Sequence, residues 1–225
     1  MDPISERHLE NTKNQLLYIS VSFLVTLLLA FLSLGLGSSA SLDLFTTIKI
    51  LFGFETGSEM QLAIIWEIRF PRILMAIVGG AALAIAGSLM QGCLGNPLVS
   101  PLTLGVASGA ALGAAMAMVF EFSINSNSDL ATVANAFIFS LIVVAVIIQL
   151  GNFRSVSAES YILVGIAVTF IAGALISIMQ YFATDTQLSQ LAHWSFGSLS
   201  RPTLGNTLWI SVALIGLLPS ALKKA

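Results

Sequence analysis

The chain has 225 residues, of which 56% are hydrophobic and 9% charged, and its mean hydropathy is +0.94. Soluble domains carry about 25% charged residues, so this composition excludes the soluble classes and predicts an all-α, polytopic membrane protein. The formal net charge of −2 gives no indication of nucleic-acid binding.

Residues that carry chemistry are few and scattered. The single Cys93 cannot form an internal disulfide, and one thiol is not a metal site, so we interpret it as a small apolar residue. No lysine follows a glycine, as a phosphate-binding loop requires, and neither His8 nor His193 belongs to a catalytic pattern. We therefore predict no enzymatic activity, no cofactor and no metal site.

Six apolar stretches are long enough to cross a bilayer, which takes about 20 residues in a helix. They are 16–36, 72–94, 102–120, 130–150, 160–183 and 204–222. They predict one transmembrane domain over residues 16–225, after an N-terminal tail of residues 1–15. The small residues at 37–41 could end a signal peptide, but the first stretch is longer than a usual signal core, which favours a retained span.

The positive residues set the predicted orientation, because they favour the cytoplasmic side. With the N-terminus inside, five cations lie in the cytoplasm and four outside. The inner set is Arg7, Lys13, Arg154, Lys223 and Lys224, and the outer set is Lys49, Arg69, Arg72 and Arg201. An even number of spans then places both termini in the cytoplasm.

Two connections between the spans are unusual. Residues 37–68 are too many for a tight turn, and apolar residues at roughly helical spacing over 42–53 predict an interfacial helix. Residues 92–105 include Asn96 and Pro97 and are rich in glycine and proline. Irregular backbone at membrane depth must be buried in protein or face a watery cavity, so this segment is a candidate for packing or for lining a pathway.

Small residues recur at helical spacing in two of the spans. The set consists of Gly105, Gly109 and Gly113 in the third span and of Gly80, Ala84, Gly87 and Ser88 in the second. Close approach of two helix backbones is the simpler interpretation of such a pattern. A substrate path lined by these residues is the alternative.

All charged residues fall outside the six spans or at their ends. Ion-coupled carriers commonly hold an ionisable group inside the bilayer, so a secondary carrier of that kind is disfavoured. The strongest polar residues in or near the spans are Gln91, Asn96, Gln149 and Gln180. We interpret them as partners in helix–helix hydrogen bonds in preference to ligand contacts.

Residues 66–113 closely resemble the FecCD-type permeases, the membrane subunits of ABC importers for iron-siderophores, haem and cobalamin. The matching landmarks are Arg-x-Pro-Arg at 69–72, "GAALAIAGSLMQG" at 80–92 and "NPLVSPLTLGVASGAALGA" at 96–114. A weaker similarity continues over 161–200. The resemblance implies a multi-pass protein of the cell membrane that translocates a substrate without covalent chemistry.

The resemblance also implies partners. In the family, two permease subunits form the pathway, cytoplasmic ATPase subunits drive it, and a periplasmic or lipid-anchored binding protein delivers the substrate. Arg69 and Arg72 are then expected to face outward and to meet acidic residues of that binding protein. Simple anchoring of the second span at the lipid headgroups is the alternative for both arginines.

The resemblance also implies functions for two further segments. A cytoplasmic gate is implied in 151–159, with Ser155 and Ser157 as candidates, and an ordinary connecting loop is the alternative. A short helix on the outer side is expected over 186–197, because Thr184 or Asp185 can cap the N–H groups that follow.

One feature departs from the family. Its members resemble ten-span proteins, whereas here the sixth stretch is followed by residue 225, where the segment that couples to the ATPase is expected. The chain is therefore expected to be truncated, split or divergent. A non-transporting remnant or scaffold that packs with a full-length partner is the alternative to a permease subunit.

Overall fold

The computed structural model describes residues 3–37, 42–120, 128–151, 157–199 and 202–222. The regular structure of these residues is helical throughout, with no strand among them, which confirms the all-α prediction. In chain order the helices are α1 (Pro3–Gly35), α2 (Leu44–Leu51), α3 (Glu59–Ala63), the π-helical η1 (Ile64–Arg69), α4 (Phe70–Leu94), α5 (Val106–Phe120), α6 (Ser128–Gly151), α7 (Ala158–Phe182), α8 (Asp185–Phe196) and α9 (Leu204–Leu222).

Every predicted span is a helix, but the helices differ in length. Within the described residues, four stretches are long and apolar enough to cross a membrane, and they are Asn11–Gly35, Glu59–Leu94, Leu130–Leu150 and Glu159–Phe182. The apolar helices Val106–Phe120 and Leu204–Pro219 are shorter. The third span therefore begins four residues later than predicted, because the backbone turns at Gly105, whose φ is +75°.

The second span is longer than the sequence predicts. A helix was expected to begin near residue 72, with Pro71 in its first turn, but the chain is helical from Glu59 onward. Pro71 therefore lies inside a continuous helical stretch, where it cannot donate a hydrogen bond to the preceding turn. The preceding turn is π-helical, and the Phe70 N–H bonds to the Ile65 carbonyl, five residues back.

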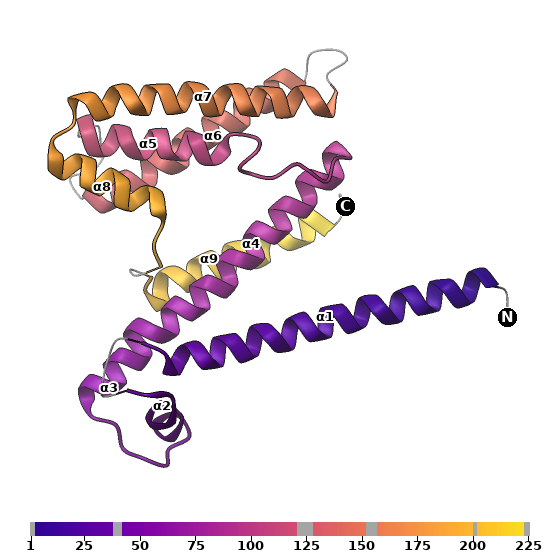
Figure 1. Ribbon diagram of the computed structural model, residues 1–225, viewed down its shortest axis with the longest axis vertical. Coiled ribbons are helices and arrows are strands. Elements are labelled where there is room, and N and C mark those ends of the chain that lie inside the picture. Colours follow the sequence, from indigo (N-terminus) through magenta and orange to yellow (C-terminus); the bar gives the residue numbers. More distant parts are fainter. Residues whose placement is uncertain (1–2, 38–41, 121–127, 152–156, 200–201, 223–225) are drawn as a thin grey trace. The chain divides into compact units, whose positions relative to one another are not determined.

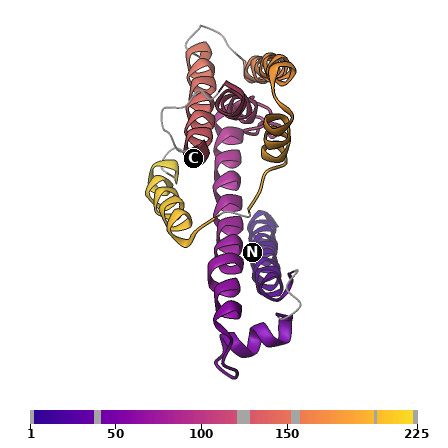
Figure 2. The ribbon, with the colours of Figure 1, turned by 90° about the vertical axis from the view of Figure 1, so that its left-hand side faces the viewer.

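The chain forms two compact units. The first contains residues 1–78 and 199–212, and its buried side chains include Leu42, Thr47 and Ile65. Within it, α1 ends beside α2, and a Cβ atom added to Gly35 would overlap Leu44. Figure 2 shows α2 lying crosswise to the helical stretch that follows it.

The second unit contains residues 79–198 and 213–225. Its centre is α5, which packs along both α6 and α7 (Figure 1). The short α8 closes the end of α5 through an apolar cluster of Ala115, Val119, Met179 and Leu191. The sequence predicted a helix here, and the structure confirms it together with the Thr184 cap, which accepts a hydrogen bond from the Gln187 N–H.

Candidate functional site

Arg69, the first arginine of the Arg-x-Pro-Arg motif, is turned inward. It is the last residue of η1, and only 7% of its surface is exposed. Its Nη1 donates to the Leu34 carbonyl, and its Nη2 donates to the Leu42 carbonyl at 3.3 Å. Carbonyls in the last turn of a helix lack partners within that helix, so the guanidinium completes the end of α1 and ties it to the segment that leads into α2.

The backbone beside Arg69 leaves no room for a side chain. A Cβ atom added to Gly37 would lie 2.6 Å from Nη2 of Arg69. The close approach explains why a glycine suits this position, since a methyl group would displace the guanidinium from its two carbonyls. The sequence alone shows only a glycine among other small residues at this position, which does not predict the contact with Arg69.

Arg72, the second arginine of the motif, is exposed. Its Nε donates to the Leu199 carbonyl at 3.0 Å, and among the described residues it has no carboxylate partner within salt-bridge distance. The outer edge of its guanidinium therefore stays available to a carboxylate from another molecule, which an arginine can bind through two parallel hydrogen bonds. The structure thus gives the two arginines of one motif different surroundings.

The irregular segment between α4 and α5 is bonded internally. Asn96 accepts a hydrogen bond from the Leu98 N–H at 2.9 Å, and Gln91 donates to the Pro97 carbonyl at 3.1 Å. Gln91 was expected in a helix–helix hydrogen bond, but it bonds this connection instead. Val99 is fully buried. The connection is buried only in part, because Val99 and Leu104 are enclosed whereas Leu98 and Leu102 are exposed.

The same connection packs against α7 through two glycines. A Cβ atom added to Gly105 would lie 2.8 Å from the Gly165 carbonyl oxygen, and one added to Gly165 would overlap the Thr103 carbonyl. Gly165 was not singled out in the sequence, where it is one small residue in an apolar span. Its importance follows only from the backbone that lies opposite.

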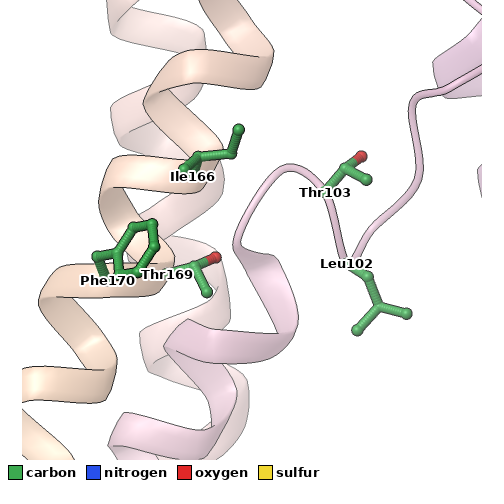
Figure 3. A pocket seen from close by; sticks show the side chains of 5 residues that line it. All are labelled: Leu102, Thr103, Ile166, Thr169 and Phe170. Carbon is green, nitrogen blue, oxygen red and sulfur yellow. The ribbon is translucent and has the colours of Figure 1, made fainter.

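A shallow pocket lies beside this contact (Figure 3). It is lined by Leu102 and Thr103 of the connection and by Ile166, Thr169 and Phe170 of α7, and its volume is about 270 Å³. Pockets for small ligands usually measure about 300–1,000 Å³, so this one is too small and too open to enclose a haem-sized chelate. It is a feature of helix packing and not a complete substrate site.

The remaining small residues separate into two groups. Gly109 and Gly113 face α6, where added Cβ atoms would meet Val143 and overlap the Asn135 carbonyl, respectively. A Cβ atom added to Gly80 or Gly87 would meet no atom of the described residues within 4 Å. Of these four glycines, only Gly109 and Gly113 therefore have a packing partner in the described part of the chain.

The expected gate falls largely outside the described residues. This applies to Ser155 and to most of 151–159. Ser157 is exposed at the N-cap of α7, and its Oγ lies 3.3 Å from the Ser160 Oγ. Its role in a gate stays a prediction.

Long apolar helices and glycine-mediated helix contacts define a polytopic membrane protein. The chain belongs to the FecCD transport family, which it matches over residues 25–224. This match confirms the resemblance to the family that the Arg-x-Pro-Arg motif and the glycine-rich stretch after it indicate.

Individual relatives show a range of cargoes. The chain is 35% identical over 199 residues to the hemin transport system permease of Yersinia pestis, which covers 85% of this chain and 58% of that protein. It is 33% identical over 211 residues to the molybdate import system permease of Haemophilus influenzae, covering 88% and 59%. The chain spans about three fifths of the length of these relatives.

A solved structure also resembles this fold. It is an inward-facing conformation of a transporter provisionally assigned to the metal-chelate type of ABC transporter. The TM-score is 0.70 and the sequence identity is 28%, and the match covers 89% of this chain and 59% of that one. The likeness therefore extends over most of the helices described above.

Proposed function

We propose that this chain is a permease subunit of an ABC importer that translocates a metal chelate. The observation that carries the proposal is the match to a transport family over residues 25–224. The chain itself supplies the pathway and no covalent chemistry.

The proposed substrate is a chelate of the iron-siderophore, haem or cobalamin kind. The named cargoes of relatives, hemin and molybdate, differ in size and charge, so the family alone does not choose among chelates. The proposed partners are a second permease subunit, identical or related, cytoplasmic ATPase subunits and an extracytoplasmic binding protein. ATP hydrolysis on the ATPase subunits would shift the populations of inward- and outward-open states.

The Arg-x-Pro-Arg motif is the proposed docking point for the binding protein. Arg72 is exposed and supports this role, whereas Arg69 is buried against the Leu34 and Leu42 carbonyls. We therefore assign the docking charge to Arg72 and assign Arg69 to holding the turn beside it. Opposed charges at such a rim mainly supply orientation and association rate.

The orientation and the remaining sites belong to the same proposal. Both termini are assigned to the cytoplasm, so a cysteine at position 125 should be labelled from outside the cell only. Ser155 and Ser157 are the proposed gate. Gly80 and Gly87, which meet no neighbour in the described chain, are the proposed surface for the second subunit or the pathway.

Co-purification tests the proposal. The full chain carrying an affinity tag should bring down an ATPase subunit and a second permease subunit from its native membrane. Reconstituted with these partners and the binding protein, it should accumulate chelate in vesicles only when ATP is supplied. Recovery of another permease without any ATPase would instead identify a scaffold and would overturn the proposed transport role.

A further inference from the structure

We infer that α2 is a lipid-binding helix whose exposed face, formed by Phe45, Lys49 and Phe52, lies in the headgroup layer at the C-terminal end of α1. The sequence predicts only that a helix here is interfacial. The structure adds which face is turned outward, at what level it lies and what holds it there.

The level of α2 follows from its links to α1. The long span Asn11–Gly35 ends where a Cβ atom on Gly35 would overlap Leu44, the first residue of α2. The Arg69 guanidinium bonds both the Leu34 carbonyl in α1 and the Leu42 carbonyl just before α2. Because these contacts join the last turn of a membrane span to the first turn of α2, the short helix begins at the membrane boundary.

The length of the second span also indicates that the membrane boundary lies near the end of α1. The helical stretch Glu59–Leu94 has 36 residues, or about 54 Å, whereas the hydrocarbon core is about 30 Å thick. Its charged residues Glu59, Glu67, Arg69 and Arg72 all lie in the first half, and 73–94 carries none. The hydrocarbon segment therefore begins after Arg72, and the α3–η1 part that packs beside the end of α1 lies at or above the headgroups.

One face of α2 has no covering in the described chain. Phe45 and Lys49 of α2 are four residues apart and share a helical face, and Phe52, the C-cap of α2, follows three residues later and continues that side. Phe45 is 74% exposed and Phe52 is 65% exposed, while Thr47 on the opposite face is buried. Phe54 follows at 81% exposure, with its ring centroid 6.4 Å from that of Phe52.

The chemistry of this face fits the lipid boundary better than water or the hydrocarbon core. Removing a phenylalanine side chain from water is favourable, so three exposed rings are costly in an aqueous loop. Lys49 lies between the rings and pairs with Glu55 at 3.5 Å, a polar arrangement that the core would not accept. Aromatic rings beside a cation are typical of helices lying at the headgroups.

Spin labels can locate this face in the full chain. Because Cys93 is the single cysteine, a Cys93→Ser background allows one label at a time at Phe45→Cys or Phe52→Cys. The protein is reconstituted in phosphatidylethanolamine–phosphatidylglycerol vesicles, and the collision rates of each label with oxygen and with a water-soluble nickel chelate are measured. Leu24→Cys, an exposed position within the α1 span, is the hydrocarbon control, and Thr56→Cys in the connection after α2 is the aqueous control.

Labels at 45 and 52 should show an oxygen-to-nickel collision ratio several-fold above that at 56 and below that at 24. A ratio equal to that at 56 would place α2 in water and overturn the inference. Low collision rates with both probes would mean that protein covers the face, and would overturn it as well. None of these readings depends on transport, so the result is independent of the proposed function.

Discussion

The two compact units differ in the kind of contact that stabilises each of them internally. In the first, one long polar side chain reaches two backbone carbonyls, at positions 35 and 27 residues away along the chain. In the second, Gly105, Gly113 and Gly165 bring backbones into contact because they have no side chain. The contacts in the first unit depend on the hydrogen-bond donors of a side chain, and those in the second depend on the lack of a Cβ atom.

The difference follows from the solvent that each contact faces. Lipid tails are as apolar as the helix surface, so helices in the hydrocarbon gain stability from close packing of small residues. At the end of a span, water and headgroups compete, and unpaired helix carbonyls need a donor. Substitutions should therefore act through steric overlap in the second unit and through lost hydrogen bonds in the first.

Gly165→Ala should give the largest effect on stability. The added methyl group would overlap the Thr103 carbonyl, and backbone cannot yield as a flexible side chain can. We expect a loss of about 3 kcal/mol, the upper range for overpacking, measured as a lower midpoint of thermal unfolding in detergent. The matched control is Gly173→Ala in the same helix, where the methyl group meets no described atom within 4 Å. Equal midpoints for the two variants would contradict the proposed contact.

Arg69→Ala should have the next largest effect. It leaves the Leu34 and Leu42 carbonyls without their donor, which costs about 1–3 kcal/mol when such groups are buried. Arg69→Lys should recover part of this loss, because an ammonium can reach one carbonyl more readily than two. Arg72→Ala is the control and should change the unfolding midpoint little. The same destabilisation at both positions would show that the two arginines are equivalent after all.

Arg72→Glu should weaken capture of the binding protein by about tenfold, or about 1.4 kcal/mol, without lowering the unfolding midpoint. An exposed carboxylate keeps its hydration, but it would face acidic residues of the partner. The effect should shrink as salt rises, since rim charges are screened over about 8–10 Å at physiological ionic strength. Binding of the delivery protein to the purified complex at two salt concentrations is the measurement.

Lys49→Glu is the control for Arg72→Glu. Lys49 is another exposed cation of the first unit, and it forms an ion pair with Glu55. If charge reversal at Lys49 weakened binding as much as reversal at Arg72, a general surface charge would explain the result. The docking assignment to Arg72 would then have to be abandoned.

The smallest effect concerns Asp43, the N-cap of α2. Its carboxylate accepts hydrogen bonds from Thr46, which hold the pKa of Asp43 below its usual value of 3.8. A lowered pKa means that the cap contributes stability above the unfolded-state value and loses it as the pH falls through the folded-state value. The mobility of a spin label at 52 should therefore rise below pH 3.8 and stay constant above it. Asp43→Asn should remove this dependence, and an unchanged acid response in that variant would assign it to another group.

The helices of this protein were largely predictable, because each span must bury its own backbone hydrogen bonds in lipid. The α8 helix was predictable too, since Thr184 and Gln187 form a local capping pair. The boundaries were harder. The helix through Pro71 extends back to Glu59 because a π-helical turn accommodates the proline, and nothing in the local pattern distinguishes that turn from a helix start.

The sequence by itself determined the membrane class, the helical spans and the family, since hydropathy and contiguous motifs are properties of a single stretch of chain. Only the tertiary structure decided which arginine is buried and which is exposed, because Arg69 finds its carbonyls on residues far away in the sequence. It also decided which glycines matter. Gly165 and Gly173 both lie in the apolar sequence of one span, but among the described residues only Gly165 has another backbone segment lying against it.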